Sequence, residues 1–235
     1  MIDYSIYAMS RSGHHAFCNW IADNNPSPVV IMLNNANMGW ENKVMCSRTS
    51  KIDILKNGGG KEYSRIVNIE TFDVDYFEKY NILDFNIKHH ILFLRDFKNW
   101  VASIFQGGGE AKNELTQPFI DQLGNEQTST IDLWKKQAKM LISQPENIIS
   151  VLYDNWVSDE KYRERISSLL KIRCSDIPTK MASAGNGSSF TKMNGGVFDS
   201  NVLNRHKQLA DNMEYMKIIR NNEECVELSR EIFDA

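Results

Sequence analysis

The sequence has few cysteines. Its 235 residues include only Cys18, Cys46, Cys174 and Cys225, and no two of them form a Cys-x-x-Cys pair. A small secreted protein held by disulfides, or a domain built on structural zinc, needs a denser set. The spacing predicts reduced thiols in a reducing compartment and argues against both classes.

The chain also lacks an excess of positive charge and a long apolar run. The 27 lysines and arginines are outnumbered by 30 aspartates and glutamates, which gives a formal net charge of −3. No broad basic field is therefore present to hold a nucleic acid or an anionic membrane. No apolar stretch reaches the roughly 18 residues that span a bilayer, and the first residues lack a signal-peptide pattern. We expect a cytoplasmic protein without a membrane span.

Low-complexity segments and internal repeats are absent as well, and the composition is that of an ordinary globular protein. Five short apolar runs predict strands buried on both faces: residues 4–9, 29–33, 65–69, 90–94 and 148–153. Helical patterns lie between or after them: residues 13–23, 97–105, 130–143 and 159–170. This alternation predicts an α/β fold with three layers, in which helices flank a central, mostly parallel sheet. A ligand would then bind at the carboxyl ends of the strands.

The pattern changes near residue 177. A glycine-rich segment over residues 184–196 predicts a long loop, and residues 201–233 predict one or two polar terminal helices. Glycines also cluster at 58–60 and 107–109, and loops of this kind often cover a site. We expect a single domain over residues 1–235.

The first candidate site residues lie near the N-terminus, where a strand, a turn and a helix start follow one another. Ser10-Arg-Ser-Gly13 is the turn, and a turn of this kind aims backbone N–H groups and the positive end of the helix dipole at one point. This is an anion cradle, to which Arg11 adds a full charge. An ordinary turn in which Ser12 caps the helix fits the same residues.

A nucleotide kinase motif is missing from this turn. Gly-x-x-x-x-Gly-Lys-Ser/Thr places a lysine on the phosphates and a hydroxyl group on Mg²⁺, and here Gly60-Lys61 is followed by Glu62. The cradle therefore suits an anion that has no obvious metal partner.

A second candidate site lies after the strand at 90–94. Arg95 ends this strand, and Ser103 follows eight residues later on the predicted helix. The guanidinium and the hydroxyl group could close on one phosphate. An ion pair between Arg95 and Asp96, or a surface carboxylate, is the alternative.

Together these segments resemble the sulfotransferases that use 3′-phosphoadenosine 5′-phosphosulfate (PAPS), whose fold is P-loop NTPase-like. In that family a Lys/Arg-Ser-Gly-x-x loop holds the 5′-phosphosulfate, and the matching residues are Arg11, Ser12, Gly13, His14 and His15. An Arg-Asp-Pro-x-x-x-x-x-Ser segment holds the 3′-phosphate, and Arg95 and Ser103 match it. Residues 149–156 resemble the family's strand that ends in Tyr-Glu-Asp-Leu. A loop of the family that covers the nucleotide is matched by Gly187, Ser188, Ser189 and Phe190.

The chain departs from this family at several positions. His14 and His15 stand where many members have Ser or Thr, and Phe97 replaces the proline. The Arg-Lys-Gly motif that closes on the 3′-phosphate in cytosolic members is missing, and Lys192 is the candidate for its role. The resemblance implies PAPS as donor, 3′-phosphoadenosine 5′-phosphate (PAP) as product, and no required metal.

Sulfuryl transfer also needs a group that accepts the proton of the acceptor hydroxyl. Glu70 ends the predicted strand at 65–69, at the position where cytosolic sulfotransferases have a histidine base and where other branches use glutamate. The expected catalytic residues are thus Arg11, Glu70 and His15. Glu41 is a further candidate base, and a surface or helix-capping carboxylate is the structural alternative for Glu70.

The remaining histidines and aromatic residues have structural interpretations. We expect His89 and His90, at the amino end of a strand, to be structural and His206 to lie on a helix surface. Tyr153 and Trp156 fit packing better than contact with the adenine or the acceptor.

The sequence thus predicts a sulfotransferase that acts on a hydroxyl group of a small molecule, glycan or lipid headgroup. The variable loops at 58–61, 107–117 and 183–196 would decide the acceptor. Two alternatives stay open: a P-loop-type nucleotide kinase or phosphotransferase, and a catalytically silent nucleotide-binding module.

Overall fold

The computed structural model of this chain describes residues 3–27, 30–33, 36–39, 43–46, 64–71, 88–107, 110–120, 126–177 and 200–234. The strands are β1 (Asp3–Ala8), β2 (Val30–Leu33), β3 (Ala36–Gly39), β4 (Lys43–Cys46), β5 (Ser64–Glu70), β6 (His89–Leu94), β7 (Phe119–Ile120), β8 (Glu126–Gln127) and β9 (Ile148–Leu152). The helices are α1 (His14–Asn24), α3 (Phe97–Gly107), α4 (Glu110–Glu114), α5 (Thr130–Ile142), α6 (Tyr153–Ser158), α7 (Glu160–Leu170), α8 (Arg205–Gln208), α9 (Met213–Arg220) and α10 (Glu223–Phe233), with a 3₁₀ helix, η4, at Ser200–Asn204.

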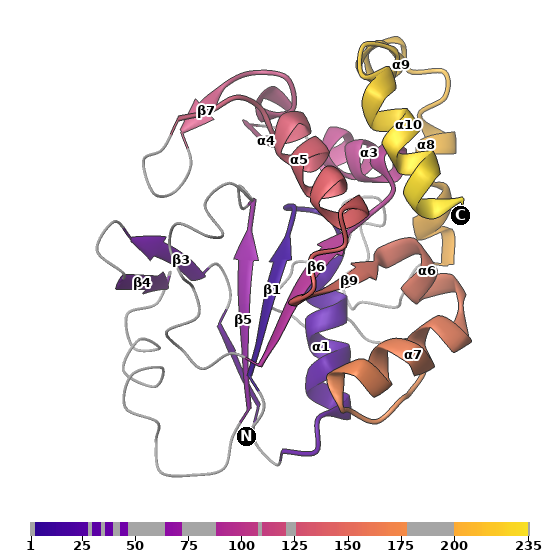
Figure 1. Ribbon diagram of the computed structural model, residues 1–235. Coiled ribbons are helices and arrows are strands. Elements are labelled where there is room, and N and C mark those ends of the chain that lie inside the picture. The colour runs from indigo at the N-terminus through magenta and orange to yellow at the C-terminus, as the bar shows by residue number, and fades with distance from the viewer. Residues whose placement is uncertain are drawn as a thin grey trace.

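Five of the described strands form one parallel sheet in the order β2-β5-β1-β6-β9 (Figure 1). The central strand β1 pairs with β5 on one side and with β6 on the other. Numbered along the chain, these strands lie in the order 2-3-1-4-5, so the chain changes direction across the sheet at β1. A parallel sheet opens a ligand crevice at such a point, beyond the carboxyl ends of its strands.

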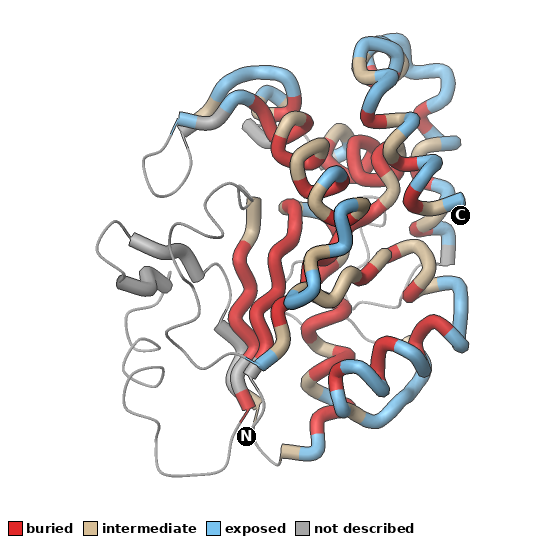
Figure 2. Tube along the Cα trace, viewed as in Figure 1, coloured by how far each residue is buried: buried red, intermediate tan, exposed pale blue. Residues whose placement is uncertain are grey.

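Both faces of the sheet are buried, as the apolar runs predict (Figure 2). On β6, Leu92 and Leu94 pack on one side, and Ile91 and Phe93 pack on the other. Successive side chains of a strand point to opposite faces, so each central strand contributes to two cores. This explains why its sequence is apolar throughout rather than alternating.

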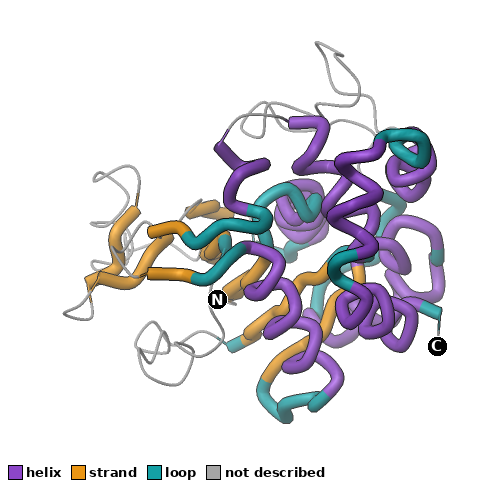
Figure 3. The backbone as a smooth tube through the Cα atoms, turned by 90° about the horizontal axis from the view of Figure 1, so that it is seen from above, coloured by secondary structure: helices purple, strands orange, loops and turns teal. Residues whose placement is uncertain are grey.

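Helices cover the two faces in separate layers (Figures 1 and 3). One core combines strand residues with α3, α5, α9 and α10, and the other combines them with α1, α6 and α7. Trp100 and Trp134 are fully buried in the first core, and Trp20 and Trp156 in the second. The predicted α/β fold with three layers is therefore confirmed.

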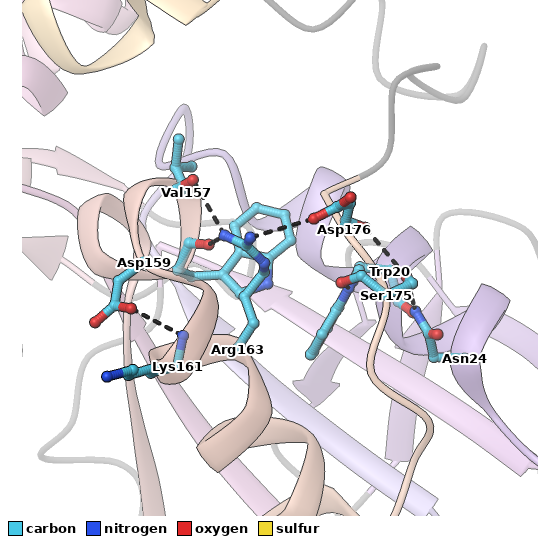
Figure 4. A network of polar contacts seen from close by, with 9 residues as sticks. Trp20, Asn24, Val157, Asp159, Lys161, Arg163, Ser175 and Asp176 are labelled. Carbon is cyan, nitrogen blue, oxygen red and sulfur yellow. Dashed lines mark hydrogen bonds and ion pairs between the residues drawn. The ribbon is translucent and has the colours of Figure 1, made fainter.

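A polar network joins α1, α6 and α7 to the segment that follows α7 (Figure 4). The Trp20 indole N–H donates to the Ser175 carbonyl oxygen at 3.0 Å, and the Asn24 amide donates to the Ser175 hydroxyl oxygen at 2.8 Å. Arg163 donates to the carbonyl oxygens of Trp156 and Val157, at 3.0 and 3.3 Å. The bonds to Ser175 hold α1, which carries part of the candidate site, and the Arg163 bonds join α7 to α6.

The C-terminal part of the chain differs from the predicted one or two helices. It contains η4, α8, α9 and α10 instead. Asparagine residues separate these elements: the Asn212 side chain accepts from the amides of Glu214 and Tyr215 at the start of α9, and Asn221 and Asn222 lie between α9 and α10. Asparagine competes with the backbone for hydrogen bonds, so it starts and ends helices more readily than it continues them.

Two boundaries near β9 also differ from expectation. The predicted strand 148–153 ends at Leu152, and Tyr153 begins the short helix α6, which the sequence pattern did not predict.

Within the described ranges, every helix is too short or too polar to cross a lipid bilayer.

Replacing Arg163 tests the hydrogen bonds that join α7 to α6. Arg163→Ala leaves the buried Trp156 carbonyl oxygen and the partly buried Val157 carbonyl oxygen without this donor, so we expect the free energy of unfolding to fall by about 2 kcal/mol. Asp176 adds little to this loss because its side chain is 88% exposed. The exposed neighbour Lys161→Ala is the control and should change stability by less than about 0.5 kcal/mol. Equal denaturant midpoints for both variants would show that the network does not stabilise the fold.

Candidate active site

The residues that directly follow four of the parallel strands lie at one edge of the sheet. Ala8 is in register with Glu70 on β5 and with Phe93 on β6, and Leu94 is in register with Leu152 on β9. Because all these strands are parallel, the turn after β1, the end of β5 and the residues after β6 and β9 meet there. Most of the described candidate residues thus lie at the carboxyl edge of the sheet, as predicted.

The turn between β1 and α1 has an unusual backbone. Arg11 has a φ angle of 64° and Gly13 one of 94°, both in the left-handed region. The Trp100 indole N–H donates to the Ser10 carbonyl oxygen at 2.9 Å and holds the turn from the α3 side. Such a backbone places the exposed Arg11 side chain beside the start of α1.

The N-cap residue of α1 is Gly13, not Ser12. The Ser12 side chain is instead within 3.1 Å of His14 Nδ1, and the Ser12 amide donates to Met9. The capping alternative for Ser12 is therefore wrong. The first N–H groups of a helix have no intrahelical acceptor, so the amides that start at Gly13 provide the positive end of the helix.

Arg95 lies directly under this turn. Its side chain is only 1% exposed and donates to the carbonyl oxygens of Arg11, at 3.4 Å, and Val202, at 2.6 Å. The alternative ion pair with Asp96 is not found among the described residues. The structure thus brings the Arg95 guanidinium against the backbone of Arg11.

The Tyr153 ring contacts Arg95 and lies close to Gly13 in the turn after β1. The ring lies 4.8 Å from the Arg95 guanidinium carbon, and a Cβ atom at Gly13 would come within 2.5 Å of the ring. Glycine is thus required at position 13 both for its φ angle and for this close approach. Tyr153 and Trp156 are both buried, which confirms that they pack in the core.

Ser103 is 4% exposed and has a neighbour that the sequence analysis missed. The Arg205 guanidinium Nη1, from α8, lies 3.5 Å from the Ser103 hydroxyl oxygen. Arg205 is itself buried, although it belongs to the polar C-terminal part. A signal was present in the sequence: Arg205-His-Lys207 is a basic run that follows the glycine-rich segment.

A carboxylate network anchors the start of α3 beside Arg95. Asp154 accepts from the Asp96 amide at 2.9 Å and from the Asn99 side chain at 3.3 Å. Burial raises the pKa of Asp154 to about 6, although Arg95 opposes this rise. His206, which is half-buried on α8, also bonds to Asn99 on α3, with 3.0 Å from Nδ1 to Oδ1.

Glu70 lies at the end of β5, beside His14 and His15 at the start of α1. Its Oε1 atom is 3.0 Å from His14 Nε2 and 3.3 Å from His15 Nε2. Burial would raise the pKa of Glu70, but the hydrogen bond from His14 and the nearby imidazoles outweigh it, so the pKa lies below its usual value. The side chain is therefore a carboxylate at neutral pH, and the interpretation as a surface carboxylate is wrong because the side chain is only 16% exposed.

Other predicted residues lie elsewhere. His90 is at the amino end of β6, where its Nδ1 atom is 2.7 Å from the Ser5 hydroxyl oxygen, which fits a structural role. His89 stacks on Tyr4. Several candidates fall outside the described residues: Glu41, Gly187, Ser188, Ser189, Phe190 and Lys192.

Comparison with known proteins identifies the fold. No protein-family model matches the sequence, and no curated protein matches it. Among solved structures, mouse sulfotransferase SULT7A1 complexed with PAP is similar over 97% of this chain and 84% of its own, with a TM-score of 0.53 and 13% identity. A sulfotransferase from Alicyclobacillus acidocaldarius is similar over 97% of this chain and 96% of its own, with a TM-score of 0.47 and 11% identity.

The likeness to the mouse enzyme agrees with the parallel sheet and with the resemblance seen in the turn after β1 and in the segment after β6. At 13% identity, this likeness describes how the backbone is arranged and gives no information on the acceptor substrate. The chain has the sulfotransferase fold.

Proposed function

We propose that this chain is a sulfotransferase that moves the sulfuryl group of PAPS to a hydroxyl group of a small molecule, glycan or lipid headgroup. One observation carries the proposal: a single sheet edge combines a turn that opens α1, two buried arginines, of which Arg205 lies beside Ser103, and a carboxylate held by imidazoles. These groups match three needs of the reaction, which are donor binding, charge stabilisation and proton removal.

Two phosphate subsites follow from the positions of the cations. Arg11 and the amides at the start of α1 would hold the 5′ end of the donor. Ser103 and Arg205, with Arg95 behind them, would hold the 3′-phosphate. In this proposal Arg205 takes the role of the missing Arg-Lys-Gly motif. Lys192 and the Gly187–Phe190 loop remain candidates on the resemblance alone.

The charges around Arg95 favour an anionic ligand. Arg95 and Arg205 are both buried, and Arg95 Nε has no hydrogen-bond partner among the described residues. Asp154 contributes one negative charge beside Arg95, and two buried guanidinium groups attract further negative charge. A phosphate group at Ser103 would supply that negative charge, and a nucleotide with only a 5′-phosphate would not.

The chain's own groups can support in-line transfer. PAPS supplies the sulfuryl group and leaves as PAP, while the acceptor oxygen forms the new bond to sulfur. Arg11 and the start of α1 stabilise the negative charge that grows on the departing phosphate oxygen. Glu70 accepts the proton of the acceptor hydroxyl, directly or through His15, whose side chain is 30% exposed. None of these steps requires a metal ion.

The C-terminal part would cover the bound nucleotide. The Val202 carbonyl oxygen accepts from Arg95, and Arg205 reaches Ser103, so η4 and α8 already close over the 3′-phosphate subsite. This supports one domain over residues 1–235, in which residues 177–235 complete the site.

Nucleotide binding provides the first test. PAP should raise the melting temperature, because a ligand at 100 times its Kd stabilises the native state by about 2.7 kcal/mol. Arg205→Ala should weaken PAP binding by about 10- to 100-fold, since a charged hydrogen bond to the 3′-phosphate is lost, and should leave the binding of 5′-AMP unchanged. Arg11→Ala should weaken both ligands. Calorimetric titration measures each affinity.

Arg230→Ala is the matched control, because this arginine lies exposed on α10 away from the site. Arg95→Ala is less informative, since Arg95 also donates to Arg11 and Val202. Equal stabilisation by ATP with Mg²⁺ and by PAP would favour a nucleotide kinase. If neither nucleotide raised the melting temperature, the proposed donor site would be wrong.

Turnover of Glu70→Gln provides the second test. The amide cannot accept the proton, so transfer of radiolabelled sulfate from PAPS to any acceptor of the wild type should fall by about 10²- to 10⁴-fold. PAP affinity should be retained, because Glu70 lies outside the phosphate subsites.

Glu231→Gln, on the exposed surface of α10, should keep full activity. If Glu70→Gln also kept full activity, Glu70 would not be the base. If wild type bound PAP but transferred nothing to a broad set of acceptors, the chain would be a silent nucleotide-binding module.

A further inference from the structure

Three metal-binding side chains converge next to the proposed donor site. His14, His15 and Glu70 each offer one ligand atom, and these atoms all lie within 4.8 Å of one another. Glu70 Oε1 is 3.0 Å from His14 Nε2 and 3.3 Å from His15 Nε2. Ligand atoms around a tetrahedral zinc ion lie about 3.3 Å apart when the metal–ligand bonds are about 2.0 Å. The two distances to Glu70 therefore match the spacing of a tetrahedral site, and the distance between the two imidazole ligand atoms is at most 4.8 Å.

The neighbouring groups orient two of these ligands. The Ser12 hydroxyl group lies 3.1 Å from His14 Nδ1, which turns Nε2 of the same ring toward Glu70. The Asn68 side chain hydrogen-bonds to Glu70. Supporting hydrogen bonds of this kind, on an imidazole and on a carboxylate, are typical of protein metal sites.

The ligands also belong to rigid elements. His14 and His15 are the first residues of α1, and Glu70 is the last residue of β5, which is held in register with Ala8. The Thr71 amide donates to the Ala8 carbonyl oxygen at 2.9 Å and fixes the end of β5 further. His14 is almost fully buried, while His15 is 30% exposed and gives an ion access from solvent.

We infer that His14, His15 and Glu70 form a binding site for a divalent transition-metal ion of the Zn²⁺ type. Two imidazole nitrogens and one carboxylate oxygen select such ions over Mg²⁺ and Ca²⁺, which prefer oxygen ligands. Three protein ligands leave a fourth position for water or another small ligand. This inference goes beyond the proposed function and does not rest on it.

The surrounding positive charge lowers the metal affinity of this site. The positive end of α1 and the Arg11 guanidinium oppose a cation, so affinity should be weaker than at a structural zinc site with four ligands. A metal would also occupy the lone pairs of Glu70 and His15 that the proposed transfer needs for the proton. Bound metal is therefore expected to block the site rather than to support transfer.

Cobalt spectroscopy of the full chain tests the inference. Chelator-treated protein is titrated with Co²⁺, and we expect visible d–d absorption that saturates at one ion per chain. Zn²⁺ should abolish the absorption, and excess Mg²⁺ should leave it unchanged. His15→Ala and Glu70→Gln should each weaken Co²⁺ binding by about tenfold or more. His14→Ala should do the same, but His14 is buried, so the other two variants are decisive if this one fails to fold.

His89→Ala is the matched control, because His89 lies at the amino end of β6, at the opposite edge of the sheet. It should retain the wild-type cobalt spectrum. Absence of a saturable spectrum, an unchanged spectrum in both His15→Ala and Glu70→Gln, or its loss in His89→Ala would overturn the inference. A thiolate charge-transfer band would also overturn it by placing a cysteine at the metal. The cobalt readout needs no nucleotide, so its failure is distinct from failure of the proposed sulfotransferase activity.

Discussion

The parallel pairing of β1 with both β5 and β6 is the constraint on which the site depends. The register places Ala8 beside Glu70 and beside Phe93, so the turn after β1 has Glu70 on one side and Arg95 on the other. A shift of one residue in either pairing would turn each apolar side chain to the opposite core. The two buried cores therefore determine which groups meet at the carboxyl edge.

Arg95 connects the turn after β1, the 3₁₀ helix η4 and the Tyr153 ring at the start of α6. From one buried position its guanidinium donates to the turn after β1 and to η4, and it lies over the Tyr153 ring. The Trp134 indole N–H donates to the Arg95 carbonyl oxygen at 3.1 Å and so fixes its backbone. A planar guanidinium suits this role because it has five donors in a fixed geometry. Arg95 thereby sets the distance between the proposed phosphate subsites.

Residue patterns were sufficient to predict the sheet and the turn after β1. Each central strand is a short apolar run, because both of its faces are buried, and a turn followed by a helix is a local signal. Arg95 and Ser103 were found for the same reason, since one directly follows β6 and the other lies eight residues later on α3. The start of α6 at Tyr153 was missed because nothing in residues 148–153 marks the end of the strand.

Contacts between distant segments were not predictable. Arg205 contacts Ser103, which lies 102 residues earlier in the chain. Ser229 on α10 donates to Asp96, which lies 133 residues earlier. Neither partner follows a local spacing rule. The two imidazoles around Glu70 were also not expected together, because adjacent residues of a helix ordinarily point in different directions. They converge here because they form the first turn of α1, directly beside the end of β5.

The most direct test of the central claim is a crystal structure of the chain with PAP bound. The account predicts one PAP molecule across the carboxyl edge, with the 5′-phosphate on the amides at the start of α1. The 3′-phosphate oxygens should lie within about 3.2 Å of the Ser103 hydroxyl oxygen and of a guanidinium nitrogen of Arg205. A PAP molecule bound at another edge, or one whose 3′-phosphate points away from Ser103, would contradict the account.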